Sequence, residues 1–328
     1  MMHLHKRSLF LVLALFVLVI SGCAVTRPVG MPIATVEGIN GHFFPGQIIS
    51  LPEGKIISFE ELIARLKEKR LVFVGEVHSS AEDHLIEVQI LQALMGRKPR
   101  PDVAMEFFQV PQQQAIGRYF QGKIKETQFL KEAHWRRNWG FPYRFYRPLI
   151  LATREHNRNL FAINVPRKIV KKVARTGLDN LSPQERNQIA RHIDLTNREH
   201  RAFLKKVFSQ HAHGDLSNFE YFYQAQCVWE DSMAEHIAEL LDKQQGPLLV
   251  FAGKGHILNR YGIPDRVIRR ISVSTATVVT HAVDKPIILE RHGADFVWLT
   301  GRNFSWHPGK IPWKKIKTSD SVTHEKQD

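Results

Sequence analysis

The feature that most constrains the fold is a short apolar run that ends at a glycine and continues into polar residues. Residues 71–74 are apolar and partly β-branched, which predicts a buried strand, and Gly75 ends it. The polar stretch behind it predicts the start of a helix. Similar apolar runs at 102–108, 159–164 and 246–252 also alternate with helical patterns.

This alternation predicts an α/β fold with three layers, in which a mainly parallel sheet lies between helices. Residues 167–243 carry only helical patterns, so we expect an all-helical insertion that caps the carboxyl edge of the sheet. Further strands are expected at about 271–280 and 294–299. The 328 residues are enough to bury a sizeable core. The only two cysteines, Cys23 and Cys227, exclude a disulfide framework.

Polar side chains follow four of these strands where the strands end: Glu76 with His78, then Glu106, Asn164 and His256. The carboxyl ends of parallel strands form one edge of the sheet, and ligands of open α/β folds bind there. We therefore expect these side chains to lie together. Each histidine taken alone could equally be a hydrogen-bonding loop residue, and only the shared placement favours a site.

Two histidines and a glutamate are suitable ligands for Zn²⁺ or another divalent ion that keeps one position open for water or substrate. The predicted metal ligands are His78, His84, Glu106 and His256. A carboxylate could act as general base, so Glu76 and Glu106 are the catalytic candidates if the chain is a hydrolase. His84 stands in the first turn of its helix and is equally well explained as a solvated helix residue.

The N-terminal residues carry the pattern of a signal peptide. A basic start precedes an apolar run at residues 9–20, which is too short for a stable membrane span. The run ends in Ile20-Ser-Gly-Cys23, which resembles a bacterial lipobox and implies cleavage before Cys23 and lipidation of its thiol. The alternative is an ordinary signal peptide with an incidental cysteine. Ala24 stands where an inner-membrane retention signal would have Asp, so we expect a cell-envelope protein, lipid-anchored in the outer membrane and facing the periplasm.

These patterns divide the chain into four segments. Residues 1–22 are the predicted lipoprotein signal peptide. Residues 23–57, rich in Gly and Pro, are predicted to be a tether and a hairpin that leads into the domain. Residues 58–305 form the predicted α/β domain. The tail at 306–328 is polar and is predicted to be disordered.

The chain is strongly basic, with a net charge of +14. Such a charge suits an acidic ligand, a membrane surface or nucleic acid. The export signal argues against nucleic acid, so no nucleic-acid partner is expected. The charge is concentrated at residues 131–175, where twelve Lys and Arg outnumber Glu132 and Glu155 and give a local net charge of +10. The same stretch is rich in aromatic residues.

An ordered set of short motifs is more specific than any of these features. It consists of Gly75-Glu-Val-His78, His84 with Gln89, Met105-Glu106, Ala162-Ile-Asn-Val-Pro166, the helical stretch at 219–234, Ala252-Gly-Lys-Gly-His256 and Ala294-Asp-Phe-Val-Trp298. Over about residues 50–300, the set resembles the ChaN-like haem-binding lipoproteins. These lie within a wider superfamily that includes the Tiki/TraB peptidases and erythromycin-esterase-like proteins.

The resemblance implies a membrane-anchored protein of haem and iron uptake that holds haem at a dimer interface, with two haems face to face and tyrosine as iron ligand. The implied partners are haem, a second copy of the chain, the membrane through the lipid anchor, and an outer-membrane haem receptor. The candidate iron ligands are Tyr143, Tyr146, Tyr221 and Tyr223, any of which could instead be packed. The candidate propionate ligands, which could instead form a solvated basic face against anionic lipid, are Arg136, Arg137, Arg144 and Arg147.

The second hypothesis is a metal-dependent hydrolase, peptidase-like or esterase-like, that uses His78, Glu106 and His256. The wider superfamily shares a Gly-x-x-His, a Glu and a later Gly-Asn-x-His. Here Lys254 stands where the later motif has Asn, which puts inherited peptidase activity in doubt. We therefore expect binding of haem rather than turnover.

Overall fold

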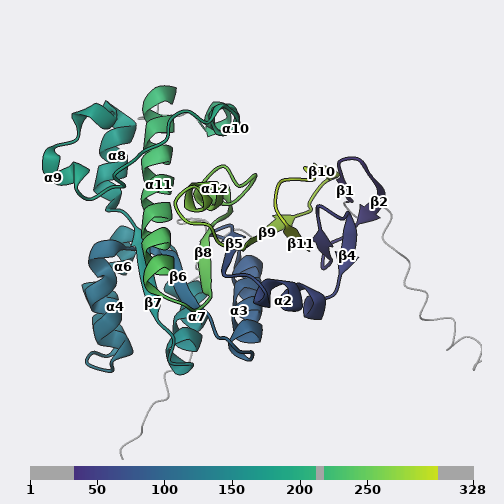
Figure 1. Ribbon diagram of the computed structural model, residues 1–328, viewed down its shortest axis with the longest axis horizontal. Coiled ribbons are helices and arrows are strands. Elements are labelled where there is room, and N and C mark those ends of the chain that lie inside the picture. Colours follow the sequence, from purple (N-terminus) through teal and green to yellow (C-terminus); the bar gives the residue numbers. More distant parts are fainter. Residues whose placement is uncertain (1–32, 212–217, 302–328) are drawn as a thin grey trace, which may run out of the picture.

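The computed structural model describes residues 33–211 and 218–301 (Figure 1). The predicted signal peptide, Cys23 and the tail at 306–328 lie outside these ranges, and the division into domains stays a prediction. Within the two described ranges, no helix is long and apolar enough to cross a membrane.

The centre of the molecule is an eight-stranded sheet with the order β4-β3-β11-β9-β5-β8-β6-β7. The six strands from β11 to β7 are all parallel, and only β3 and β4 run antiparallel to their neighbours. The predicted mainly parallel sheet is therefore confirmed. Its strands are β3 (Ile48–Ser50), β4 (Lys55–Ile57), β5 (Leu71–Glu76), β6 (Asp102–Gln109), β7 (Leu160–Asn164), β8 (Leu248–Gly253), β9 (Thr275–Ala282) and β11 (Phe296–Thr300).

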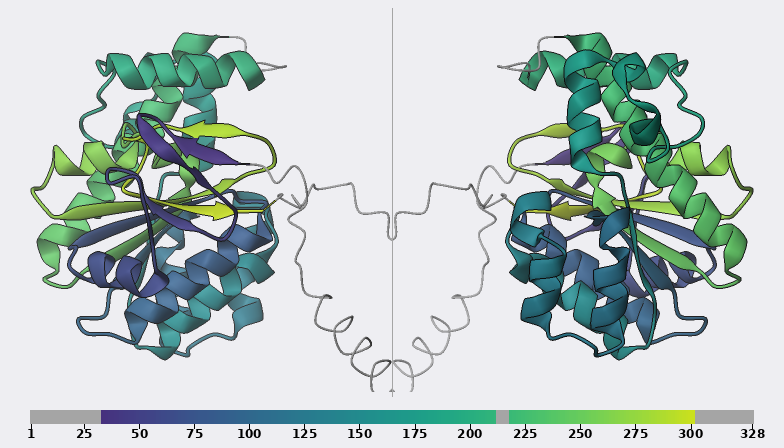
Figure 2. Two further views of the ribbon diagram at one scale, coloured as in Figure 1. Left: turned by 90° about the vertical axis from the view of Figure 1, so that its right-hand side faces the viewer. Right: turned by 90° about the vertical axis from the view of Figure 1, so that its left-hand side faces the viewer.

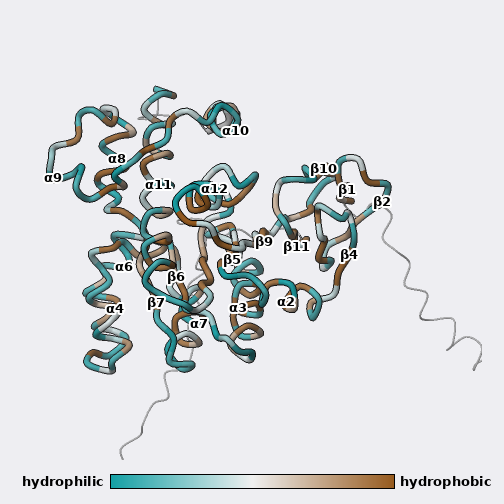
Figure 3. The backbone as a smooth tube through the Cα atoms, viewed as in Figure 1, coloured by the Kyte–Doolittle hydropathy of each residue, from teal (hydrophilic) through white to brown (hydrophobic). Residues whose placement is uncertain are grey.

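Helices cover both faces of the sheet, so the fold has the three predicted layers (Figure 2). Side chains alternate between the faces along each strand: Val72 and Val74 of β5 point to one core, whereas Leu71 and Phe73 point to the other. Hydrophobic residues follow the central strands in Figure 3, as expected for strands that are buried on both sides.

The first face carries the helices that follow β5 and β6, together with the helix that precedes β5. They are α2 (Phe59–Lys67), α3 (Ala81–Met95), α4 (Gln113–Phe120), α5 (Glu126–Glu132), α6 (Trp135–Asn138) and α7 (Tyr143–Glu155), with a 3₁₀ turn at Val110–Gln112. The second face is covered by α12 (Ile263–Ile268) and by the C-terminal half of the long helix α11 (Phe219–Lys243), which contributes Met233, Ile237 and Leu241 to the core.

The predicted all-helical insertion is confirmed for the part of 167–243 that the structure describes. It holds α8 (Arg167–Thr176), a 3₁₀ turn at Leu178–Asn180, α9 (Pro183–Arg186), α10 (Arg198–His211) and α11. One small apolar cluster joins α8 to the N-terminal half of α11, and another joins α10 to this half of α11. This half of α11 and the helices around it stand above the carboxyl edge of the sheet (Figure 1).

Residues 33–57, predicted as tether and leading hairpin, contain two hairpins that belong to two different sheets. β1 (Ala34–Val36) and β2 (Ile39–Phe43) pair with each other, and β10 (Ile287–Leu289) joins β1 to complete a small sheet. β3 and β4 extend the main sheet, where Ile49 and Leu51 are buried. These strands are too short to show a period in the sequence.

Candidate functional site

The polar residues predicted at the strand ends do gather at the carboxyl edge of the sheet. Glu76 ends β5, and its Oε1 atom lies 2.5 Å from Nδ1 of His78. Burial raises the pKa of Glu76 to about 7. Burial alone would lower the pKa of His78, because it disfavours the charged imidazole. The attraction of the Glu76 carboxylate is stronger and raises the pKa of His78 to about 9. The Glu76 carboxylate therefore favours the charged form of the His78 ring.

Glu106 lies inside β6 rather than at its end, because the strand continues to Gln109. Its Oε2 atom accepts a hydrogen bond of 2.7 Å from the backbone N–H of Gly253 on the neighbouring β8. A Cβ atom at Gly253 would stand 2.8 Å from Cε1 of His78 and 3.6 Å from Oε2 of Glu106, so a larger residue here would displace the His78 ring. Oε1 of Glu106 is buried and has no hydrogen-bond partner among the described residues.

His256 follows β8 in the 3₁₀ turn Lys254–His256 and is held by two carboxylates. Its Nδ1 atom lies 3.1 Å from Oε1 of Glu230 on α11, and its Nε2 atom lies 3.6 Å from Oε1 of Glu106. Burial works against the charged ring, but these two glutamates raise the pKa of His256. Asn164, at the end of β7, donates to the backbone oxygen of Glu106 and accepts a hydrogen bond from Nε1 of Trp229.

His84 is buried behind this edge rather than solvated. Its Nδ1 atom lies 2.8 Å from Oε2 of Glu87, its Nε2 atom lies 3.3 Å from the backbone oxygen of His78, and its ring stacks on Phe145. Burial lowers the pKa of His84, so its neutral form is favoured. Its position in the core excludes the solvated alternative.

The predicted metal site is not supported. In the part of the chain that the structure describes, no three His, Cys, Asp or Glu side chains are arranged to hold a metal ion. The reason is visible in the pairing: Nδ1 of each histidine, His78, His84 and His256, faces a different glutamate. These ring nitrogens therefore do not converge on one point.

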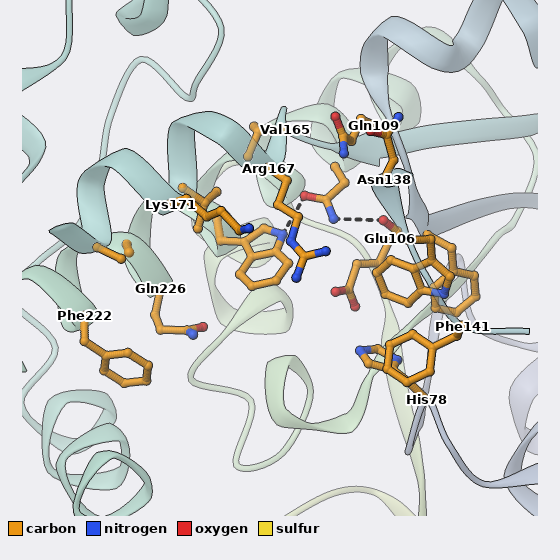
Figure 4. Close-up of a pocket in the computed structure, with 17 residues that line it drawn as sticks. His78, Glu106, Gln109, Asn138, Phe141, Val165, Arg167, Lys171, Phe222 and Gln226 are labelled. Atoms are coloured by element: carbon orange, nitrogen blue, oxygen red, sulfur yellow. Dashed lines mark hydrogen bonds between the residues drawn. The ribbon is translucent and has the colours of Figure 1, made fainter. Parts of the chain in front are cut away.

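A cavity of about 300 Å³ opens beside this cluster, between the sheet edge and the helical cap (Figure 4). The sheet contributes His78, Glu106 and Asn164, and α8 and α11 form the opposite wall. Its lining is mostly apolar, with aromatic side chains from β6, the connection between α6 and α7, and α11: Phe107, Trp139, Phe141, Phe222 and Trp229. Glu106 and the guanidinium group of Arg167 both reach into it in Figure 4.

A second, wider cleft of about 710 Å³ lies on the outer side of α6 and the start of α7. Three of the four predicted propionate ligands and one predicted tyrosine line it together: Arg136, Arg137, Arg144 and Tyr143. Trp135 and Phe141 supply apolar walls. The fourth arginine, Arg147, lies outside the lining and pairs with Glu126 at 2.8 Å.

Tyr143 is half-buried, and its hydroxyl group donates a hydrogen bond of 2.9 Å to Oε1 of Glu126. Burial, and then this contact, raise the pKa of the Tyr143 phenol. Arg147 donates to the same carboxylate from Nε. A chain of hydrogen bonds thus runs from Tyr143 in the cleft wall through Glu126 to Arg147 at the surface.

The other three tyrosines lie away from both openings. Tyr146 is fully buried in the main core, against Phe107, Trp135 and Trp139. Tyr223 is buried in the cap. Tyr221 is half-buried and lies against Gly177, where an added Cβ atom would come within 2.9 Å of its ring.

The sequence did not reveal the buried charges that organise the cap. Glu230, Asp231 and Arg266 are fully buried, and Arg266 pairs with Asp231 and lies 3.5 Å from Glu230. Glu230 also contacts His200 at 3.2 Å, and so joins α10 and α12 to His256. One signal in the sequence could have indicated these buried charges. Glu230 and Asp231 stand beside Trp229 and Met233, in the part of the helical pattern that is expected to be buried.

Comparisons with known proteins identify one family, and a solved structure shows the same fold. The family model described as haem-binding uptake, Tiki superfamily, ChaN matches residues 62–267. The solved structure titled "Cofacial heme binding to ChaN of Campylobacter jejuni" has a TM-score of 0.61 at 19% identity, covering 76% of this chain and 95% of that one. An erythromycin esterase, EreC, gives a TM-score of 0.45 at 13% identity, with coverage of 72% and 76%.

One curated protein also matches. The chloroplastic protein RETICULATA-RELATED 5 of Arabidopsis thaliana is 22% identical over 288 residues, which is 80% of this chain. The match covers only 38% of that relative's own length. The two proteins therefore share a region rather than a whole architecture.

Proposed function

Since the chain belongs to the ChaN family of haem-binding uptake proteins in the Tiki superfamily, we propose that it binds haem in the cleft beside α6 and α7. The observation that carries the proposal is the composition of this cleft. A phenol, the partly exposed ring of Phe141 and three arginines line the same opening, which is the larger of the two described above.

The cleft offers a suitable side chain for the macrocycle and for the propionates of haem. The apolar macrocycle suits the partly exposed ring of Phe141. The two propionates suit Arg136 and Arg144, because guanidinium groups bind carboxylates through paired hydrogen bonds. Arg136, Arg137 and Arg144 are exposed and form no ion pair within the described ranges, so they are available.

We propose Tyr143 as the iron ligand, since it is the one of the four predicted tyrosines that lines the cleft. Haem supplies ferric iron, for which a phenolate is a known axial ligand. Tyr143 must lose its proton to bind in that form. Glu126 accepts the hydrogen bond from the hydroxyl group and is positioned to take this proton, and Arg147 holds the carboxylate in place.

Dimerisation, anchoring and location are further parts of the proposal. A haem in an open cleft would leave one apolar face exposed, and a second copy carrying its own haem would cover it. The printed title of the Campylobacter jejuni structure describes such a cofacial arrangement for that protein. We propose in addition that Cys23 carries a lipid that anchors the protein in the outer membrane, where it exchanges haem with a receptor.

Titration with haemin, followed through the Soret absorption band, tests the proposed cleft. The double variant Arg136→Gln/Arg144→Gln should bind haemin at least about tenfold more weakly, because each lost charge-assisted pair contributes about 1.5–3 kcal/mol. The control is Arg198→Gln, which removes an exposed arginine from the cap. Equal affinity of the double variant and the control would refute this cleft as the haem site.

Sedimentation during the same titration tests the dimer. The monomer–dimer equilibrium should shift toward the dimer as haemin is added, up to one haem per chain. Monomers that bind haemin without associating would contradict the cofacial arrangement while leaving the cleft itself in place.

A further inference from the structure

The cavity between the sheet edge and the cap has the walls of a site for a small flat molecule. Five aromatic side chains enclose its volume of about 300 Å³: Phe107, Trp139, Phe141, Phe222 and Trp229. Ligand sites commonly measure about 300–1,000 Å³, so this one is at the small end of the range. It suits a molecule with one aromatic ring, which the rings can contact face to edge. A haem is too large for it.

The mouth of the cavity carries unpaired positive charge. Arg167 and Lys171 line it, and an adjoining opening of about 450 Å³ shares them and adds Arg137 and Lys168. All four side chains are exposed, and none forms an ion pair with any residue in 33–211 or 218–301. These cations are therefore free to bind an anion.

The position of these charges on α8 is unfavourable without such an anion. Arg167 and Lys168 stand in the first turn, where the helix dipole repels cations. Arg167 and Lys171 are also four residues apart, a spacing at which like charges destabilise a helix. The helix begins after Pro166, which provides no side-chain cap for its free backbone N–H groups.

The floor of the cavity offers a buried carboxylate oxygen that is not hydrogen-bonded to any described residue, with Nε2 of His256 3.6 Å away. Glu106 is 1% exposed, and its Oε1 atom has no hydrogen-bond partner among the described residues, whereas Oε2 is bound to Gly253. Its carboxylate reaches into the cavity in Figure 4. The His256 contact is longer than a hydrogen bond, so Oε1 can still accept one from a ligand that brings a hydroxyl group to it.

We propose that this cavity binds a small aromatic acid, whose carboxylate lies on Arg167 and Lys171 and whose hydroxyl group, on the far side of the ring, donates to Glu106. The site is distinct from the haem cleft, which lies on the other side of Phe141. It needs neither haem nor the dimer.

Calorimetric titration of the full chain in detergent with three probes tests the ligand class. 4-Hydroxybenzoate carries both groups, benzoate lacks the hydroxyl group, and phenol lacks the carboxylate. 4-Hydroxybenzoate should bind at least about tenfold more tightly than either of the others, since each omits one hydrogen bond to a charged group. An absence of heat with 4-hydroxybenzoate, or equal affinity for all three probes, would overturn the proposal.

Variants locate the two ends of the ligand. Arg167→Gln/Lys171→Gln, both exposed, should weaken 4-hydroxybenzoate and benzoate about tenfold and leave phenol unchanged. Glu106→Gln should reduce the ratio of the affinity for 4-hydroxybenzoate to the affinity for benzoate. If this buried change impairs folding, the exposed double variant Arg167→Gln/Lys171→Gln still tests the proposal. Lys123→Gln, an exposed lysine remote from the mouth, is the control and should change nothing. Unchanged affinity in the Arg167→Gln/Lys171→Gln variant would place the binding elsewhere.

Discussion

The same substitution, tyrosine to phenylalanine, should lower the free energy of unfolding at Tyr223 but not at Tyr146. Both rings are buried, with 0% and 1% exposure. The Tyr223 hydroxyl group donates to the backbone oxygens of Leu195 and Asn197, each at 3.2 Å. The Tyr146 hydroxyl group has no hydrogen-bond partner among the described residues, although the indole N–H of Trp139 lies nearby and is itself unpaired.

The magnitudes follow from these contacts. Tyr223→Phe removes a hydrogen bond that contributes about 0.5–1.5 kcal/mol to the free energy of unfolding, so that free energy should fall by this amount. Tyr146→Phe removes a hydroxyl group that loses its hydration on folding and gains no hydrogen bond with any described residue in return. The free energy of unfolding should therefore stay the same or rise by about 1 kcal/mol.

Urea unfolding of the two variants and the wild type measures the difference. With an unchanged denaturant slope, a shift of the midpoint reports stability directly. The midpoint should fall for Tyr223→Phe and should not fall for Tyr146→Phe. Haemin binding should persist in both variants, because neither ring lines the proposed cleft. A loss of more than about 1 kcal/mol in Tyr146→Phe would show that its hydroxyl group has a partner and would refute the reasoning.

Two further predictions concern charged groups. The folded-state pKa of His78, about 9, is above the ordinary 6.5, so the stability it contributes is complete below pH 6.5 and is lost as the pH rises toward 9. Unfolding midpoints at pH 7 and pH 9.5 should show this loss in the wild type and a smaller one in His78→Gln. Arg266→Met removes the fully buried partner of Asp231, which then pairs with Arg270 alone among the described residues, and should lower the free energy of unfolding by about 3–5 kcal/mol. Arg269→Met, at a partly exposed pair, should lower it by about 1 kcal/mol or less in the same urea assay.

The sequence was sufficient for the sheet because each central strand is an apolar run that ends at a polar residue or a glycine. β5 and β8 are buried along their whole length, so their composition alone indicates them. The parallel order then brings Glu76, Glu106 and His256 to one edge. The short strands before residue 58 lack enough residues to show a period, and their partners β10 and β11 are far away in the chain.

The roles within the site could not be predicted in the same way. Tyr143 and Tyr146 are three residues apart on α7, and only the packing of that helix decides which one is buried. The pairing of His256 with Glu230 joins residues 26 positions apart on different elements. The metal hypothesis gains no support for this reason: the sequence shows the histidines, but it does not show which carboxylate each of them faces.

The absorption spectrum of the haem-loaded protein tests the central claim most directly, when the wild type is compared with Tyr143→Phe and Tyr221→Phe. Ligation by Tyr143 predicts a Soret band and a phenolate-to-iron charge-transfer band in the wild type and in Tyr221→Phe. Both bands should shift or disappear in Tyr143→Phe. A spectrum of Tyr143→Phe identical to that of the wild type would contradict the assignment of Tyr143 as the iron ligand.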